Sequence, residues 1–142
     1  MTHHVRAERT IPVEAADLWQ TVSKMTGMED WYPELISDSA VTDVDGREPA
    51  RVCTLKDGAM LKERVILRDV ATRTFCYAID EHGMPAKNVV GTIRIDDLGD
   101  GNSFVSWSAN LMLEPENAGQ FAPLVQGMYE AGLASLEAYH CK

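Results

Sequence analysis

The pattern of apolar and polar residues changes period along the chain. The first residues alternate as in a β-strand, and from residue 13 apolar residues recur at the three- and four-residue spacing of a helix. From residue 36 to residue 113 the period is two, and after Pro115 the helical spacing returns. This succession predicts a strand, short helices, about six further strands and a long C-terminal helix, which is an α+β organisation.

Residues that favour turns separate most of the expected strands. They are Asp45-Gly46, Asp57-Gly58, Gly83 with Pro85, and Gly99-Asp100-Gly101. Connections this short imply an antiparallel meander. The pattern predicts strands at 5–11, 36–42, 50–55, 61–69, 74–80, 88–96 and 103–113, and helical segments at 13–25 and 28–32.

The last helix is expected to bury one stripe of its surface. Its start is open, because proline is tolerated in the first turn of a helix but not in the interior, and Pro123 follows Pro115 by eight residues. The stripe comprises Phe121, Leu124, Val125, Met128, Gly132, Leu136 and Tyr139.

The relative sizes of the expected sheet and helix predict a cavity. Seven strands at ~4.8 Å spacing form a sheet roughly 34 Å wide, whereas a helix with its side chains is only ~10–12 Å across. If the sheet curls around the helix, the helix leaves part of the concave side unfilled. Cavities of this kind are ligand sites, so we expect an internal pocket for a small, largely apolar molecule.

Strand alternation assigns one face of each strand to this cavity. In the three strands with the cleanest alternation, the inward sets are apolar and aromatic. Tyr77 and Trp107 are interpreted either as ordinary core residues or as ligand contacts, because the polar tips of their rings need partners. The inward sets are Phe75, Tyr77 and Ile79; Val89, Gly91, Ile93 and Ile95; and Val105, Trp107, Ala109 and Leu111.

Two charged residues also fall on the inner face. Arg51 shares the parity of the apolar residues of its strand, and Glu63 shares that of Val65 and Leu67. The hairpin at Asp57-Gly58 places the two on neighbouring strands, where opposite charges can pair. Charges near strand ends are also commonly solvated, so the pair lies either inside the cavity or at its rim. In the strand expected at 61–69, the face opposite to Glu63 is assigned Lys62, Arg64 and Arg68.

One set of residues, spread over nearly the whole chain, matches a known family in order and spacing. The set comprises Trp31 with Pro33, Arg51, Asp57-Gly58, Glu63-Arg64 with Leu67 and Asp69, Tyr77, Pro85 with Asn88, Trp107, and Ala131-Gly132-Leu133. With these residues the sequence resembles the polyketide cyclase/dehydrase branch of the START-like (SRPBCC) superfamily. The resemblance implies the helix-grip fold: a curved seven-stranded antiparallel sheet around a long C-terminal helix, with two short helices after strand 1. It implies a single domain over residues 1–142.

This fold hosts carriers, receptors, co-chaperones and cyclases, so the resemblance leaves the function open. Our first hypothesis is a carrier or binding protein for a small lipophilic or aromatic molecule. The alternatives are a polyketide cyclase or dehydratase acting on an aromatic or polyketide-like substrate, and a protein-interaction or co-chaperone module. Trp31 and Tyr32 form either a cap under a loop or a lid on the pocket. The candidate ligand contacts are Trp31, Tyr32, Arg51, Glu63, Tyr77, Val89, Trp107 and Met128.

The candidate catalytic residues, should the chain be an enzyme, are Glu63 and Arg51. Glu63 would abstract a proton next to a carbonyl group, and Arg51 or Tyr77 would stabilise the enolate oxygen. The sequence contains no nucleophile elbow, phosphate-binding loop or dinucleotide fingerprint. His82 is interpreted as a solvated loop residue or as a base or pH-sensitive gate.

A more distant likeness, to plant abscisic-acid receptors, concerns the rim of the pocket. Residues 57–69 and 81–89 look like the gate and latch regions of those receptors, which would place the loops at 57–60 and 82–87 beside the pocket mouth. The lysine with which those receptors anchor a carboxylate has no counterpart in residues 31–37, so a hormone-receptor role is not expected.

Composition and charge argue against several partners. The formal net charge is -9 and no Lys/Arg cluster occurs, which disfavours nucleic acid and anionic lipid surfaces. No apolar run approaches 18 residues and no signal peptide is visible, so no membrane span is expected. Cys53, Cys76 and Cys141 match no zinc or paired spacing, which favours reduced thiols in the cytoplasm and neither metal nor cofactor. No pattern indicates an oligomeric state.

Overall fold

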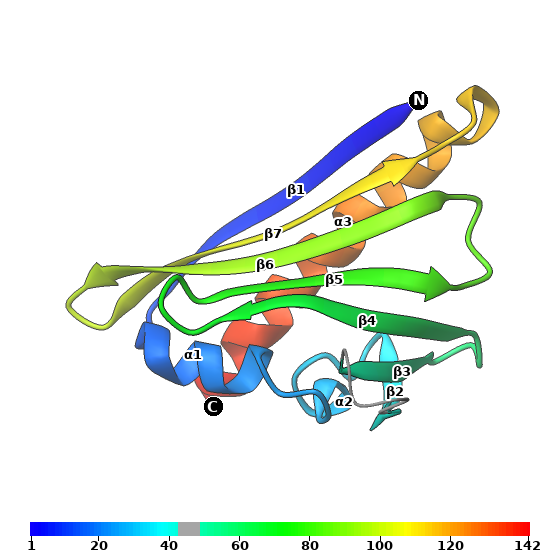
Figure 1. Cartoon of the computed structure of the whole chain (residues 1–142). Helices are drawn as coiled ribbons and strands as arrows, with labels where there is room; N and C mark the ends of the chain where they lie inside the picture. Colours follow the sequence, from blue (N-terminus) through cyan, green and yellow to red (C-terminus); the bar gives the residue numbers. More distant parts are fainter. Residues whose placement is uncertain (43–48) are drawn as a thin grey trace.

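The fold is built on one antiparallel sheet. A computed structural model describes residues 1–42 and 49–142, so the expected turn at Asp45-Gly46 lies outside the described residues. The strands in those ranges are β1 (Thr2–Ile11), β2 (Ile36–Val41), β3 (Ala50–Leu55), β4 (Met60–Asp69), β5 (Thr74–Glu81), β6 (Lys87–Gly99) and β7 (Asn102–Met112). They form a seven-stranded sheet in the order β1-β7-β6-β5-β4-β3-β2, with every neighbouring pair antiparallel (Figure 1).

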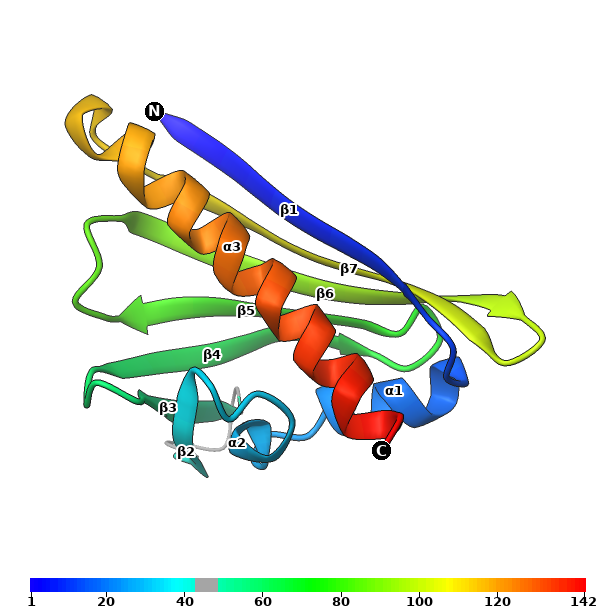
Figure 2. The ribbon, with the colours of Figure 1, turned by 180° about the vertical axis from the view of Figure 1, so that it is seen from behind.

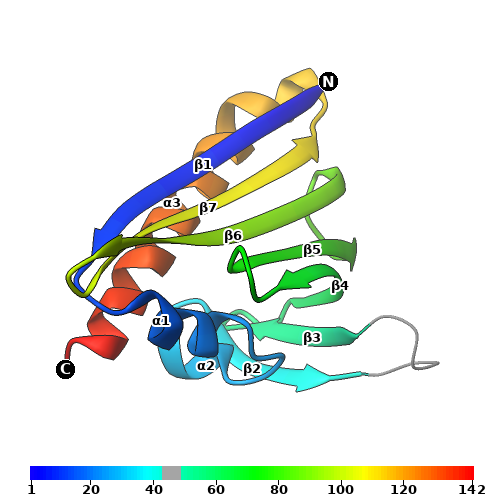
Figure 3. The same ribbon diagram turned by 60° about the vertical axis from the view of Figure 1, so that its left-hand side comes forward.

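The helices lie on one side of this curved sheet. The helix α3 (Pro115–His140) runs diagonally across the sheet (Figure 2). The helix α2 (Met28–Trp31) packs against β2 and α3, and α1 (Ala15–Val22) lies beside the C-terminal end of α3 (Figure 3). The helix-grip fold and the two short helices after β1 are therefore confirmed, although α1 is shorter than the helical pattern at 13–25 predicted.

The helix α3 begins earlier than Pro123, and its buried stripe agrees with the expected one except at Leu124. Pro115 occupies its first turn and Pro123 lies inside it, with its ring exposed. Leu124 was predicted to be buried but is 56% exposed, because it precedes the buried Val125 by one residue and therefore lies about 100° around the helix. The residues that α3 buries are Val125, Tyr129, Gly132, Leu133 and Leu136.

A β-bulge in β4 reverses part of the predicted alternation. Val65 pairs with Tyr77 of β5, but Leu67 pairs with the adjacent Cys76, so Ile66 is an extra residue in β4. A one-residue shift turns every later side chain to the other face. Leu67, which was predicted to face inward, is therefore 46% exposed.

The bulge also turns Arg68 to the face opposite to the predicted one. This residue was predicted to face outward, but it pairs with the buried Phe75 on the side that carries the helices. Its Nη1 atom donates a hydrogen bond to the carbonyl oxygen of Ser23, just after α1, at 3.2 Å. The inward sets predicted for β5, β6 and β7 are all buried, as expected.

Candidate ligand-binding site

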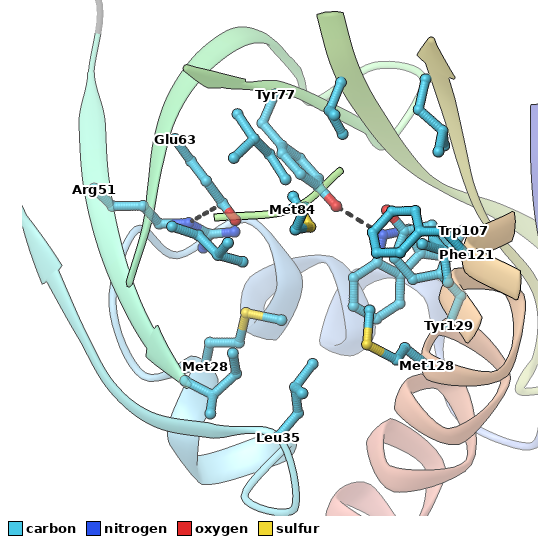
Figure 4. Close-up of a pocket in the computed structure, with 16 residues that line it drawn as sticks. Met28, Leu35, Arg51, Glu63, Tyr77, Met84, Trp107, Phe121, Met128 and Tyr129 are labelled. Atoms are coloured by element: carbon cyan, nitrogen blue, oxygen red, sulfur yellow. Dashed lines mark hydrogen bonds and ion pairs between the residues drawn. The ribbon is translucent and has the colours of Figure 1, made fainter. Parts of the chain in front are cut away.

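A small cavity lies between the sheet and α3 (Figure 4). Its volume is about 60 Å³, well below the roughly 300–1,000 Å³ of common ligand pockets. Its walls are mostly apolar and aromatic. The lining residues are Met28, Leu35, Ile36, Arg51, Leu61, Glu63, Tyr77, Ile79, Met84, Val89, Trp107, Leu111, Phe121, Val125, Met128 and Tyr129.

Aromatic side chains fill much of the space that the width of the sheet leaves beside the helix. The rings of Trp107 and Tyr129 stack at 4.4 Å with 10° between their planes. Trp31 and Tyr32 pack against Trp107 at 5.8 and 6.2 Å between ring centres. The helix approaches these rings at Gly132, where a Cβ atom would lie 2.5 Å from Trp107. The cavity is small because these rings occupy the gap.

Trp31 and Tyr32 do not line the cavity, although both were candidate ligand contacts. They connect α2 to α3: the hydroxyl of Tyr32 donates to the carbonyl oxygen of Met128 at 2.5 Å, and Ser135 Oγ donates to that of Trp31 at 2.6 Å. Burial, helped by the charge of Glu34, raises the pKa of Tyr32 to about 12. These contacts favour the interpretation of a packed cap over that of a lid.

A buried ion pair forms one part of the cavity wall. Arg51 and Glu63 are directly opposite each other on β3 and β4, and Arg51 Nε donates to Glu63 Oε1 at 2.8 Å. Their side chains are 6% and 5% exposed, so the prediction of a pair inside the molecule is confirmed. Burial alone lowers the pKa of Arg51, but the charge and hydrogen bond of Glu63 outweigh it and the pKa is raised.

The pair has hydrogen-bonding capacity left over. Arg51 Nη1 donates weakly to the carbonyl oxygen of Lys24 at 3.5 Å. No residue in the described ranges bonds to Arg51 Nη2 or Glu63 Oε2. Among the described side chains, only Thr42 Oγ1 is both fully enclosed and unpartnered, so Nη2 and Oε2 each keep some accessible surface.

A second polar group of the wall consists of neutral tyrosines. Trp107 Nε1 donates to the hydroxyl of Tyr77 at 2.9 Å (Figure 4), and Tyr129, whose ring stacks on Trp107, lines the cavity beside them. Burial raises the pKa of Tyr129 to about 12 and that of Tyr77 well above its ordinary value. Both hydroxyls therefore keep their protons at neutral pH. The ring of Tyr77 lies so close to Gly91 that a Cβ atom at residue 91 would be 2.3 Å from it.

The loop between β5 and β6 contributes to the wall. Met84 lines the cavity, whereas His82 does not, and the Nδ1 atom of His82 accepts a hydrogen bond from the Met84 backbone N–H at 3.1 Å. Met60, in the other expected mouth loop, is exposed and does not line the cavity, although the adjoining Leu61 does. The half-buried lining residues, which reach both cavity and surface, are Leu35, Leu61, Met84, Phe121 and Met128.

Sequence reasoning missed several lining residues, of which Tyr129 is the most informative. It lies four residues after Val125 and three before Gly132, on the stripe that α3 buries. That spacing was visible in the sequence. Met28, Leu35 and Met84 come from a short helix and loops, whose orientation toward the cavity no periodicity reveals.

Residues 1–42 and 49–142 offer little chemistry outside the cavity. No group of three or more His, Cys, Asp or Glu side chains there could hold a metal ion. None of the helices in these ranges combines the length and hydrophobicity needed to cross a membrane. The three cysteines are free, and burial raises the pKa of Cys53 to about 12.

Comparison with known families and structures agrees with the fold. The sequence matches the family of polyketide cyclase/dehydrase and lipid transport proteins over residues 2–140. The chain belongs to this family, within the START-like superfamily. A search of curated proteins found no match.

Solved structures with the same fold include an aromatase/cyclase and a synthase. An uncharacterized protein from Bacillus thuringiensis has a TM-score of 0.86 at 23% identity, covering 99% of this chain and 100% of that one. Zhui aromatase/cyclase from Streptomyces sp. R1128 has a TM-score of 0.84 at 15% identity, covering 97% and 93%. Norcoclaurine synthase from Thalictrum flavum, solved with dopamine and hydroxybenzaldehyde, has a TM-score of 0.79 at 20% identity, covering 99% and 87%. At these identities the likeness establishes the fold.

Proposed function

We propose that this protein binds a small, largely apolar molecule in the cavity between the sheet and α3. The observation that carries the proposal is the composition of the wall. Apolar and aromatic side chains surround a few polar groups, the Arg51–Glu63 pair and the Tyr77–Tyr129 hydroxyls, which is the usual make-up of a ligand site. A buried ion pair is costly in a core that serves packing alone, because both charges lose their hydration.

Binding requires the cavity to expand, since about 60 Å³ is too small for an aromatic ligand. The side chains best able to move are Met28, Met84 and Met128, which all line the cavity. Methionine is unbranched and adopts many rotamers at low cost. Met84 and Met128 also reach the surface, so their displacement would open the cavity and admit a ligand in one step.

The test is a binding screen with a matched pair of variants. A library of small lipophilic and aromatic molecules is screened against the wild type by native mass spectrometry and thermal shift. Val89→Phe fills the cavity from β6, whereas Val90→Phe adds the same group to the next residue, which does not line it. We expect hits whose affinity falls at least about tenfold in Val89→Phe and is kept in Val90→Phe. The proposal would be contradicted by a screen without hits, or by hits whose affinity is the same for the wild type and Val89→Phe.

A second candidate function is cyclisation of an aromatic or polyketide-like substrate. It is favoured by the carboxylate of Glu63 and the neutral hydroxyl donors of Tyr77 and Tyr129, which all line the cavity. The carboxylate would take up a proton next to a carbonyl group, and a tyrosine would polarise the carbonyl oxygen. Turnover of a poly-β-ketone that Glu63→Gln abolishes, with binding retained, would establish this function. Binding without turnover would leave the carrier function.

A further inference from the structure

We propose that the cavity selects uncharged ligands and that the Arg51–Glu63 pair sets this selectivity. The inference rests on the proposed binding function and adds the ligand class. That class is an apolar molecule whose single polar group both accepts and donates a hydrogen bond, such as a carboxamide or a phenol.

The wall of the cavity carries no net charge. Of the sixteen lining residues drawn in Figure 4, only Arg51 and Glu63 carry charge, and their charges cancel. The hydroxyls of Tyr77 and Tyr129 are neutral at physiological pH. A charged ligand would therefore be buried without a counter-charge, which an apolar environment strongly disfavours.

Anions are disfavoured because Arg51 is already paired. Arg51 would ordinarily be an anchor for a carboxylate, but its Nε atom already binds Glu63 at 2.8 Å. Its guanidinium group also packs over the ring of Phe75 at 5.4 Å, which fixes its orientation. A ligand carboxylate that approached Nη2 would come beside the Glu63 carboxylate, and two like charges at such a distance repel.

Cations are disfavoured as well, whereas neutral polar groups are not. A cation that approached Glu63 Oε2 would meet Arg51 on the other side of the same carboxylate. An uncharged polar group meets neither repulsion. It can accept a hydrogen bond from Arg51 Nη2 and donate one to Glu63 Oε2, the two atoms without partners in the described part of the chain. The pair therefore disfavours ligands of either charge and offers two hydrogen bonds to an uncharged polar group.

The wild type alone provides a first test with three probes of equal shape. These are 2-naphthamide, 2-naphthoate and 2-naphthamidine, which are neutral, anionic and cationic at neutral pH. Isothermal titration calorimetry measures their affinities. We expect the amide to bind at least about tenfold more tightly than either charged probe, because only the amide avoids an uncompensated buried charge.

Two variants should switch the selectivity in opposite directions. Glu63→Gln leaves the charge of Arg51 uncompensated, so the naphthoate/naphthamide affinity ratio should rise at least about tenfold. Arg51→Met should raise the naphthamidine/naphthamide ratio instead, and the double variant should again prefer the amide. Glu81→Gln is the control, because it removes one negative charge from the exposed end of β5 and should leave all ratios unchanged.

The outcomes separate this inference from the proposed function. Equal affinity of the wild type for the amide and the carboxylate would overturn the inference while supporting ligand binding. Selectivity unchanged in a folded Glu63→Gln variant would overturn the role of the pair. Failure of all three probes to bind wild type and variants would overturn the inference, whereas the proposed function is decided separately by the library screen. Should a variant not fold, the wild-type comparison still decides the ligand class.

Discussion

At the scale of single residues, the Arg51–Glu63 pair is the feature that departs most from an ordinary core. Its members stand directly opposite each other on adjacent strands, joined by a hydrogen bond of 2.8 Å. Each is almost fully withdrawn from water, so each depends on the other for charge compensation. Removing one member leaves a buried charge alone, whereas removing both leaves none.

This dependence predicts strong coupling between substitutions at the two positions. Arg51→Met and Glu63→Gln should each lower the free energy of unfolding by ~3–5 kcal/mol, measured by urea denaturation. The double variant should cost less than the sum, with a coupling energy of roughly 1–3 kcal/mol. The control is Arg94→Met, which breaks the Arg94–Asp96 pair, 54% and 47% exposed, and should cost ~0–1 kcal/mol. Costs below ~0.5 kcal/mol at Arg51 and Glu63, the size seen at surface sites, would contradict the burial of the pair.

The pair was predictable from sequence because it needs only local information. Parity places both residues inward, and one short hairpin brings their strands together. Trp31 and Tyr32 were different. The sequence left open whether they form a cap or a lid. Their packing against Trp107 depends on how α2 docks on α3, which no local sequence pattern predicts.

At the scale of elements, two irregularities determine how the sheet meets the helices. The bulge at Ile66 turns Leu67 outward and Arg68 toward α1. Residues 65–67 are all apolar, so polar and apolar residues do not alternate there and the sequence does not reveal the extra residue. The sheet could therefore be predicted in strand number and connection, but not in the orientation of side chains after the bulge.

The second irregularity is the close approach of α3 to the sheet at Gly132. A Cβ atom there would lie 2.5 Å from the ring of Trp107 and 2.8 Å from that of Tyr32, both of which are buried. We expect Gly132→Ala to destabilise the protein by ~1–3 kcal/mol, because the rings must shift to make room. Gly127 is exposed on the same helix with nothing within 4 Å of its Cβ position. Gly127→Ala should therefore stabilise by ~0.5–1 kcal/mol. In thermal and urea melts, the two substitutions should change the free energy of unfolding in opposite directions. Equal changes for Gly132→Ala and Gly127→Ala would argue against the close approach of α3 to Trp107.

At the scale of the whole molecule, the interior is rich in groups that stay protonated in the folded state. Burial raises the pKa of Cys53 from 9.0, and that of Tyr129 from 10.0, to about 12 in each case. The pKa of Tyr77 is raised as well. They lie on β3, α3 and β5, so the effect belongs to the core that the sheet and α3 enclose. These groups lose their protons in the unfolded chain at lower pH than in the folded one.

Stability should consequently fall on the alkaline side. Below about pH 9 every one of these groups is protonated in both states and the stabilisation is complete. Between about pH 9 and 12 the unfolded state binds fewer protons than the folded state. The free energy of unfolding therefore declines, by up to ~1.4 kcal/mol per pH unit for each such group. We expect the decline to begin with Cys53 and to steepen above about pH 10, where the tyrosines of the unfolded chain ionise.

Urea denaturation at several pH values, with two variants, tests this assignment. Cys53→Ala should flatten the profile between about pH 9 and 10, and Tyr129→Phe should reduce the slope only above about pH 10. The slope is the readout, because the small cavity left by Cys53→Ala changes the level of stability but not its pH dependence. Repulsion among surface carboxylates, at a net charge of -9, also grows with pH but is screened by salt. A wild-type slope that vanishes at high salt, or that persists unchanged in Cys53→Ala, would show that the buried groups are not its source.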